Sequence, residues 1–148
     1  QSIRTNKHLS VTHYAKLYDD SVFQNIHNQF YTLLLATSLG YSRRNGIDEQ
    51  LWHEDYNLLK YSDNQAYGQH YDGMTSTGRC VSALCYLNND YEGGELEFPH
   101  FNLTIKPQPG MLILFPSNFA YAHVAHPIIS GTKYALVTWM RDRNNFNE

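Results

Sequence analysis

From residue 52 onward, the sequence consists of short apolar and aromatic runs separated by turns that contain proline or glycine. Short runs bounded by such turn residues are typical of β-strands. The run at residues 81–87 is apolar on both faces, which is the pattern of a central strand. Strands are also predicted at residues 57–61, 67–72, 95–98, 103–106, 111–115 and 133–140. So many short strands in succession favour a β-sandwich, a barrel or a jelly roll.

One helical pattern precedes these strands. Ser21 and Gln24 have the spacing of a capping box, in which two side chains satisfy N–H groups at the start of a helix. Apolar residues and one threonine then recur at helical spacing, at Val22, Ile26, Phe30, Leu33, Leu34 and Thr37. Gly40 is expected to end this helix and residues 43–46 to form a turn, while a short strand is expected around residues 9–14. The predicted fold class is therefore α+β but mainly β, with an N-terminal helix that covers one face of a sheet.

Length and charge limit the organisation of the chain and its partners. The 148 residues suit one hydrophobic core, so residues 1–148 are expected to form a single domain. The net charge of −3 and the scattered basic residues argue against a nucleic-acid partner. No apolar run approaches the ~20 residues that span a bilayer, and the N-terminus lacks a signal-peptide core. We therefore expect no membrane partner and a cytoplasmic location, while the oligomeric state stays open.

The two cysteines, Cys80 and Cys85, belong to the same predicted strand. Because they are an odd number of positions apart, strand alternation would place their side chains on opposite faces. This placement argues against a disulfide bond between them. Two buried free thiols in a reducing compartment are therefore predicted.

His70 and Asp72 are the first candidate site residues. Since they are two positions apart on a predicted strand, their side chains would point to the same face of the sheet. With a distant histidine they would complete a 2-His-1-carboxylate triad, which binds non-heme Fe(II) and leaves three coordination positions open. A His-x-Asp tripeptide is common, so its companions in the sequence must decide. Four other histidines have no such companions and are expected to be structural or exposed: His8, His13, His27 and His53.

Lys133 begins the last predicted strand. Alternation places it on one face with Ala135, Val137 and Trp139, which would direct the lysine inward. A buried lysine is costly unless an anion compensates its charge, and a bound carboxylate would do so. The alternative is a lysine at the strand entrance whose amine reaches water.

The order of motifs in this sequence resembles the prolyl 4-hydroxylase family of 2-oxoglutarate/Fe(II) dioxygenases. The matching positions are Tyr61, Gln65, Tyr67, His70, Asp72, residues 78–81, Tyr86, Asn88, residues 93–95, Phe98, Pro107, Gly110, Phe115, His123, Pro127, Lys133 and Trp139. They extend from about Leu58 to Met140. The resemblance implies a double-stranded β-helix, a jelly-roll variant with supporting N-terminal helix or helices, and this agrees with the strands predicted above.

The resemblance also implies the metal ligands, which would be His70, Asp72 and His123. His126 competes for the third position. In the family, the distal histidine stands four residues before a proline and ten before a basic residue. Only His123 meets both spacings, with Pro127 and Lys133.

Further residues match the family's positions for the organic ligands. Lys133 matches the residue that pairs with the distal carboxylate of 2-oxoglutarate, and Tyr61 and Tyr86 match tyrosines that line the same pocket. Arg79 and Trp139 match residues on the substrate side. For these two, the alternatives are a surface salt bridge and a core aromatic residue, respectively.

The activity implied by the resemblance is hydroxylation of a C–H bond, with C4 of peptidyl proline as the first choice. Its cofactors would be Fe(II), 2-oxoglutarate and O₂, with ascorbate as the reductant, and succinate and CO₂ would be released. Asp72 favours hydroxylation, because relatives that halogenate lack this carboxylate. The partner would be a peptide or protein that contains proline. Two alternatives stay open: a hydroxylase of a free amino acid or other small molecule, and a non-catalytic metal-binding jelly-roll module.

Overall fold

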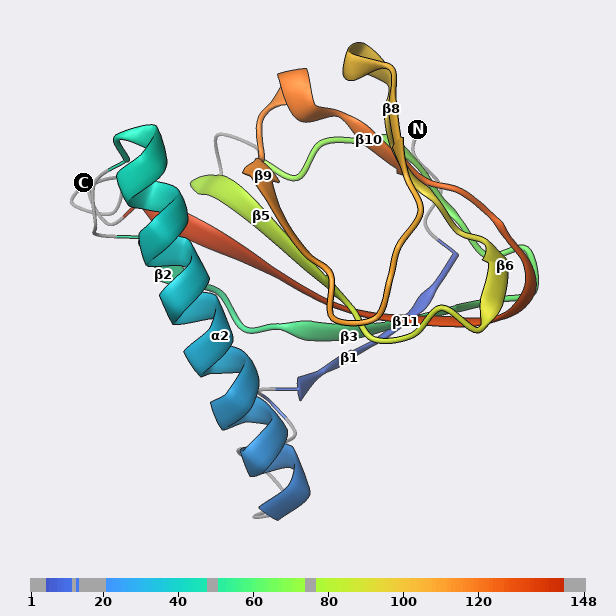
Figure 1. The fold of residues 1–148 in the computed structure, drawn as a ribbon, viewed down its shortest axis with the longest axis horizontal. Helices are drawn as coiled ribbons and strands as arrows, with labels where there is room; N and C mark the ends of the chain where they lie inside the picture. The colour runs from blue at the N-terminus through green and yellow to red at the C-terminus, as the bar shows by residue number, and fades with distance from the viewer. Residues whose placement is uncertain (1–4, 12, 14–20, 48–50, 74–76, 143–148) are drawn as a thin grey trace.

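Two antiparallel β-sheets form the body of the fold, and one long helix lies against them (Figure 1). The computed structural model describes residues 5–11, 13, 21–47, 51–73 and 77–142. The larger sheet has the strand order β1-β3-β11-β5-β9, and β2 and β6 also pair with β11; the smaller sheet has the order β4-β10-β7-β8. The strands are β1 Lys7–Ser10, β2 Leu51–His53, β3 Asn57–Ser62, β4 Tyr67–His70, β5 Arg79–Tyr86, β6 Tyr91–Gly93, β7 Leu96–Phe98, β8 Leu103–Ile105, β9 Leu112–Pro116, β10 His123–Ala125 and β11 Ile128–Asp142. Of two short 3₁₀ helices, η1 Pro99–Phe101 joins β7 to β8 within the smaller sheet, and η2 Phe119–Tyr121 joins β9 of the larger sheet to β10 of the smaller.

The long strand β11 pairs with more strands of the larger sheet than any other described strand does. It pairs with β6 near its start, with β3 and β5 along its middle, and with β2 at its end. The predicted central strand, β5, lies between β11 and β9, as expected from its two apolar faces. A mainly β jelly roll with one long helix is therefore confirmed as the fold.

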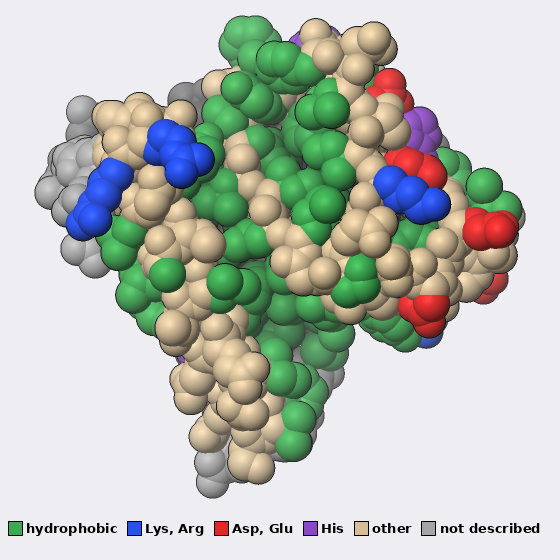
Figure 2. All heavy atoms as spheres, in the orientation of Figure 1, with side chains coloured by type: hydrophobic (Ala, Val, Ile, Leu, Met, Phe, Trp, Pro, Cys, Tyr) green, Lys and Arg blue, Asp and Glu red, His purple; other side chains and the backbone are tan. Residues whose placement is uncertain are grey.

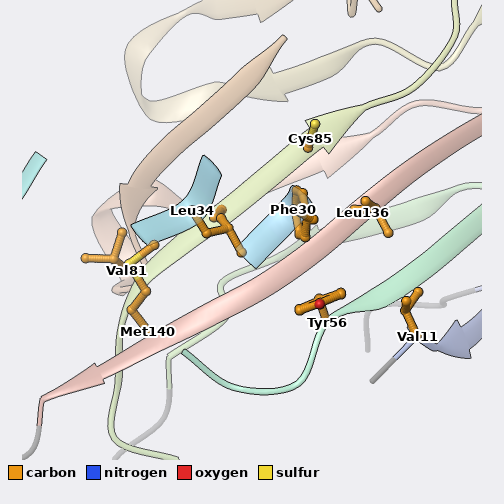
Figure 3. Close-up of a cluster of buried hydrophobic side chains, with 9 residues drawn as sticks. Val11, Phe30, Leu34, Tyr56, Val81, Cys85, Leu136 and Met140 are labelled. Atoms are coloured by element: carbon orange, nitrogen blue, oxygen red, sulfur yellow. The ribbon is translucent and has the colours of Figure 1, made fainter. Parts of the chain in front are cut away.

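The helix α2, Ser21–Asn45, covers the outer face of the larger sheet (Figure 1). Its buried residues are four apart along one stripe: Phe30, Leu34, Ser38 and Ser42. Phe30 and Leu34 pack with Tyr56, Val81 and Met140 in the largest hydrophobic cluster (Figure 3). This stripe is narrower than the predicted one.

The N-terminal half of α2 extends past β1 and is only partly covered (Figures 1 and 2). Val22 is 62% exposed, Ile26 41% and Leu33 42%, so these three residues do not belong to the core as the helical spacing predicted. Among the described residues, no helix has the length and apolar character needed to cross a bilayer.

The predicted end of the helix at Gly40 is wrong, because α2 continues to Asn45. Gly46 ends it instead, with a φ of +63° that a residue with a side chain rarely adopts. The N–H of Ile47 donates to the carbonyl of Ser42 at 2.9 Å, which is the six-to-one bond of a Schellman motif. The predicted turn at residues 43–46 is therefore the last helical turn and its cap. Basic side chains gather there (Figure 2), where they compensate the negative end of the helix dipole.

Some short strands escaped the sequence prediction. β2, β6 and β10 have three residues each, too few for an alternating pattern to stand out. The strand expected near residues 9–14 is found at Lys7–Ser10, and its predicted end at Tyr14 lies outside the described residues.

The two cysteines form no disulfide bond with each other, as predicted, but only Cys85 is buried and their predicted placement on opposite faces is wrong. Met140 pairs with Val81 and Arg141 with Arg79, so Cys80 is the extra residue of a β-bulge. A bulge shifts the alternation by one position, and Cys80 therefore packs against the same cluster as Cys85. The same shift places the Arg79 side chain on the face of β5 opposite to Cys80 and Cys85, where it lies over the ring of Trp139.

Burial in the helix–sheet interface predicts a large stability difference between two adjacent leucines. Leu34 is fully buried, whereas Leu33 is 42% exposed. Leu34→Ala should lower the free energy of unfolding by about 2–5 kcal/mol, because it removes apolar contacts and leaves a cavity. Leu33→Ala, the matched control, should change it by about 0.5 kcal/mol or less. Urea unfolding followed by circular dichroism measures both, and equal effects would contradict this packing of α2.

Candidate active site

A pocket opens between the two sheets, with walls from both of them. It contains about 530 Å³ of empty space that communicates with solvent. Its lining residues are Leu59, Tyr61, Tyr67, His70, Asp72, Leu84, Tyr86, Leu96, His123, Ala125, Lys133, Ala135, Val137 and Trp139. Four of these come from alternate positions of β11, which confirms the predicted inward face of that strand.

Three potential metal ligands meet in this pocket. His70 ends β4, Asp72 follows two residues later, and His123 begins the neighbouring strand β10, where it pairs with His70. Nε2 of His70 lies 3.6 Å from Oδ1 of Asp72, and Nε2 of His123 lies 3.8 Å from Oδ2. Two metal–ligand bonds of about 2.1 Å can span such separations. One ion can therefore bind all three side chains.

Hydrogen bonds orient both imidazole rings toward that ion. Nδ1–H of His70 donates to the carbonyl of Gly68 at 2.9 Å, and Nδ1–H of His123 donates to the carbonyl of Tyr121 at 3.1 Å. Since a carbonyl only accepts, the proton of each neutral ring is on Nδ1 and the Nε2 lone pair is left for a metal. Tyr67 adds a second restraint, because its ring stacks on His70 with the centroids 3.5 Å apart.

The electrostatics of the site favour the protonation states that metal binding needs. Burial alone would raise the pKa of Asp72, but the neighbouring His70 and His123 and the hydrogen bond from Ser82 lower it to about 2. Burial lowers the pKa of His123 from its ordinary value. At neutral pH the site therefore presents a carboxylate and a neutral imidazole, as a 2-His-1-carboxylate site requires.

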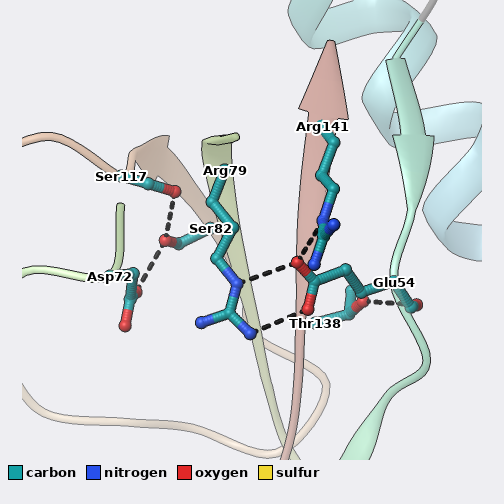
Figure 4. Close-up of polar contacts among 7 residues, drawn as sticks. All are labelled: Glu54, Asp72, Arg79, Ser82, Ser117, Thr138 and Arg141. Atoms are coloured by element: carbon teal, nitrogen blue, oxygen red, sulfur yellow. Dashed lines mark hydrogen bonds and ion pairs between the residues drawn. The ribbon is translucent and has the colours of Figure 1, made fainter. Parts of the chain in front are cut away.

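The prediction that His70 and Asp72 lie together is correct, but strand alternation is not the reason. β4 ends at His70, and Asp72 lies in the bend that follows. The carboxylate is held in place by the Ser82 hydroxyl, which donates to Oδ2 at 2.6 Å (Figure 4).

The structure brings His123, and not His126, to the other two ligands. His126 projects elsewhere, and its Nε2 forms a hydrogen bond of 2.6 Å with Oε2 of Glu97. Its side chain is 40% exposed, and it does not line the pocket. The spacing to Pro127 and Lys133 therefore selected the histidine that the fold places in the pocket.

Lys133 is 2% exposed, which excludes the alternative of an amine that reaches water. Its Nζ donates to the carbonyl of Gly94 at 2.8 Å and lies 4.6 Å from the centroid of the Tyr61 ring. Burial lowers the pKa of Lys133 to about 8, although the charge of Glu95 acts in the opposite direction. Within the described ranges, no carboxylate forms an ion pair with this amine, so an anionic ligand would supply the missing counter-charge.

Two tyrosines stand beside Lys133 in the pocket wall. Tyr61 is its cross-strand partner on β3, and Tyr86 on β5 is the partner of Ala135. Each tyrosine is 3% exposed. Burial raises the pKa of Tyr86, so its hydroxyl keeps a proton to donate at neutral pH.

Arg79 and Trp139 lie against each other beside the pocket, with the guanidinium carbon 3.6 Å from the ring centroid. Arg79 also donates from Nε and Nη2 to the Glu54 carboxylate at 2.8 and 2.7 Å, and Arg141 donates to Glu54 at 2.6 Å (Figure 4). The pKa of Glu54 would be raised by burial, but these two arginines lower it. The salt bridge considered for Arg79 is therefore real, and it fixes the guanidinium against Trp139. Trp139 lines the pocket, whereas Arg79 does not.

Glu54 and Ser82 were not among the predicted site residues. Neither stands in a recognisable short motif, and both act on residues far away in the chain: Arg79 and Asp72, respectively. Only the β5 register brings these pairs together.

The comparisons with known proteins agree with this geometry. Residues 56–141 match a family model described as the 2OG-Fe(II) oxygenase superfamily. The chain belongs to this superfamily. Members are named for the Fe(II) and 2-oxoglutarate that they use, so the family implies both cofactors, and the triad and Lys133 fit them.

Similar proteins of this superfamily are prolyl hydroxylases. Prolyl 4-hydroxylase 13 of Arabidopsis thaliana is 30% identical in an alignment that covers 62% of this chain and 44% of the relative. The chain spans less than half the length of the curated prolyl 4-hydroxylases that it matches.

Two solved structures share the fold. The viral collagen prolyl hydroxylase of Paramecium Bursaria Chlorella virus-1, in its 2OG complex, has a TM-score of 0.70 at 24% identity and covers 94% of this chain and 80% of its own. A Trichoplax adhaerens prolyl hydroxylase, in complex with a peptide fragment of hypoxia inducible factor, has a TM-score of 0.73 at 24% identity, with coverages of 97% and 66%. At these identities the likeness shows the double-stranded β-helix fold.

The two neighbouring histidines should differ in metal binding. His123→Ala removes a ligand from the triad and should weaken Mn(II) binding by more than about 100-fold. This loss exceeds the one that is usual when only a hydrogen-bond partner of a ligand is removed. His126→Ala loses only the bond to Glu97 and should leave the affinity unchanged. Isothermal titration of each metal-free variant with Mn(II) measures this. Loss of binding in the His126 variant alone would overturn the assignment.

Proposed function

We propose that this chain is a 2-oxoglutarate- and Fe(II)-dependent dioxygenase that hydroxylates C4 of proline within a peptide or protein. One observation carries the proposal: a 2-His-1-carboxylate triad faces the same pocket as a buried lysine that forms no ion pair among the described residues. The triad suits Fe(II), and the lysine suits a carboxylate. Membership of the superfamily supports the same pair of ligands.

His70, Asp72 and His123 would hold Fe(II) through Nε2, a carboxylate oxygen and Nε2. When bound, the iron supplies oxidation by O₂ coupled to decarboxylation of 2-oxoglutarate to succinate and CO₂. We propose ascorbate as the reductant that keeps the iron in its ferrous state. The task of the protein is to orient these groups and to exclude water.

Lys133, Tyr61 and Tyr86 would bind 2-oxoglutarate. The Lys133 ammonium would pair with its distal carboxylate, and the two tyrosine hydroxyls would donate hydrogen bonds. Between the lysine and Trp139, the inner face of β11 carries only Ala135 and Val137, which offer no polar group to compete. An ion pair between Lys133 and this carboxylate would be stronger beside apolar side chains than in water, because the local dielectric constant is low.

Arg79 and Trp139 would contact the substrate. The indole provides a flat apolar surface of the kind that a proline ring packs on, and the stacked guanidinium provides hydrogen-bond donors beside it. Prolyl hydroxylases among the relatives support proline as the target. The Trichoplax structure with a bound peptide fragment supports a peptide as the substrate.

The activity is tested by measuring succinate formed from 2-oxoglutarate in the presence of Fe(II), ascorbate and O₂. Proline-containing peptides should increase succinate formation, and mass spectrometry should find one added oxygen atom on proline. The matched controls are the same peptides with alanine in place of proline. Stimulation by a free amino acid alone would redirect the proposal to small molecules. Absence of any Fe(II)-dependent succinate, even uncoupled, would contradict an enzymatic function.

The buried lysine should make 2-oxoglutarate binding depend on pH. Burial holds the pKa of Lys133 at about 8 in the ligand-free pocket, below its ordinary value. The charged form binds the carboxylate and predominates below pH 8, so the affinity should fall as the pH rises above 8, by up to about tenfold per unit. Isothermal titration of the Mn(II)-loaded protein at pH 7 to 9.5 measures this.

Lys133→Arg is the matched control for this effect. Its guanidinium stays charged throughout this range, so the fall in affinity above pH 8 should disappear. Equal pH dependence in both proteins would exclude Lys133 as its source.

A further inference from the structure

Behind the Asp72 carboxylate lies a buried pair of serines. Ser82 is 0% exposed and Ser117 1% exposed, and their hydroxyl oxygens are 2.8 Å apart. Ser82 lies on the pocket face of β5, and Ser117 directly follows β9, so the pair links two adjacent strands of the larger sheet. Figure 4 shows the chain of hydrogen bonds from Ser117 through Ser82 to Asp72.

The direction of the hydrogen bonds in this chain follows from the chemistry of its members. An ionised carboxylate only accepts, so the single proton of the Ser82 hydroxyl must point to Oδ2 of Asp72. The Ser82 oxygen is then left as an acceptor, and Ser117 must donate to it. A separation of 2.6 Å between Ser82 Oγ and Asp72 Oδ2 is that of a charge-assisted hydrogen bond. The bond from Ser117 polarises Ser82 and strengthens its bond to Asp72.

Backbone contacts fix the loop of Asp72 to the same serine. The N–H of Gly73 donates to the carbonyl of Ser117 at 2.7 Å, and the N–H of Ser117 donates to the carbonyl of Cys80 at 3.0 Å. A Cβ atom at position 73 would lie 2.8 Å from the carbonyl oxygen of Arg79 and 3.0 Å from that of Ser117, so only glycine fits here. Asp72 is therefore held from two directions, through its side chain and through the next residue.

We propose that Ser82 and Ser117 are positioning residues for metal binding, which hold Oδ2 of Asp72 by a hydrogen bond and leave Oδ1 as the oxygen that binds the ion. This inference rests on the proposed metal site. Oδ1 faces Nε2 of His70 at 3.6 Å and Oδ2 faces Nε2 of His123 at 3.8 Å, but only Oδ2 accepts the hydrogen bond from Ser82. With Oδ2 engaged, the carboxylate would hold the ion through one oxygen. The three side chains would then take three coordination positions and leave the others for 2-oxoglutarate and O₂.

The test compares Mn(II) affinity in serine variants, measured by isothermal titration of the metal-free protein without 2-oxoglutarate. Ser82→Ala should weaken Mn(II) binding by about 10–100-fold, as is usual when a partner of a metal ligand is removed. Ser82→Thr keeps the hydroxyl and should bind nearly as well as the wild type. Ser38→Ala removes another buried serine hydroxyl, on α2, and should leave the affinity unchanged.

Ser117→Ala should weaken Mn(II) binding by a smaller factor than Ser82→Ala, because Ser82 keeps its bond to Asp72. Circular dichroism of the metal-free protein shows whether Ser82→Ala folds. If it does not fold, Ser117→Ala tests the proposal in its place. Unchanged affinity in either alanine variant would overturn the proposal. Equal losses in Ser82→Ala and Ser82→Thr would also overturn it, because they would assign the effect to packing and not to the hydroxyl.

The outcomes separate this inference from the proposed activity. Wild-type protein that binds Mn(II) but produces no succinate with Fe(II) would contradict the activity and leave the role of the serines intact. Normal succinate formation together with unchanged Mn(II) affinity in Ser82→Ala would overturn the role of the serines and leave the activity intact.

Discussion

The antiparallel pairing of β11 with β3 and β5 is the constraint on which the pocket depends. Side chains on a strand alternate, so fixing one residue of β11 to the interior fixes every second residue there as well. Lys133, Ala135, Val137 and Trp139 enter the pocket together for this reason. The partners on either side then present Tyr61 and Tyr86 beside them. A shift of one position in this register would turn all of these side chains out of the pocket.

The pocket gathers opposite charges in an interior that does not solvate them. Asp72 is supported by hydrogen bonds and by two imidazoles, whereas Lys133 has a carbonyl and an aromatic ring as neighbours. Burying such groups costs free energy that the rest of the fold must offset. A cation at the triad and an anion at the lysine would remove both costs at once. The ligand-free pocket is therefore suited to bind one cation and one anion together, as a metal ion and an anionic cosubstrate require.

Features that depend on local pattern could be predicted from the sequence. The strands around β5 and β11 and the inward face of Lys133 follow from strand alternation, and the helical spacing predicts the existence of α2. The choice of His123 over His126 came from the spacing of a family motif, and geometry agrees with it. Motifs of this kind succeed because they record which residues a fold brings together.

Other features depend on contacts between distant segments, and these could not be predicted. Gly40 and Gly46 are equally good helix terminators in isolation, and only packing against the sheet carries the helix past Gly40. The sequence holds no sign of the bulge at Cys80, because a bulge is a property of two paired strands. Glu54, Ser82 and Ser117 act on partners that lie 25, 10 and 35 residues away. The residues that support the site are for this reason harder to recognise than the site itself.

The bulge at Cys80 divides β5 into two parts whose side chains alternate out of phase. Beyond it, from Val81 to Tyr86, the strand is bound by the register that serves the metal and Lys133. Before it, Arg79 is out of phase with that register and is held by Glu54 and Trp139. Replacing the Arg79 side chain would change the surface beside Trp139, whereas Ser82 and Tyr86 lie beyond the bulge in the register of β11. The side chains beside the pocket and those within it therefore need not change together.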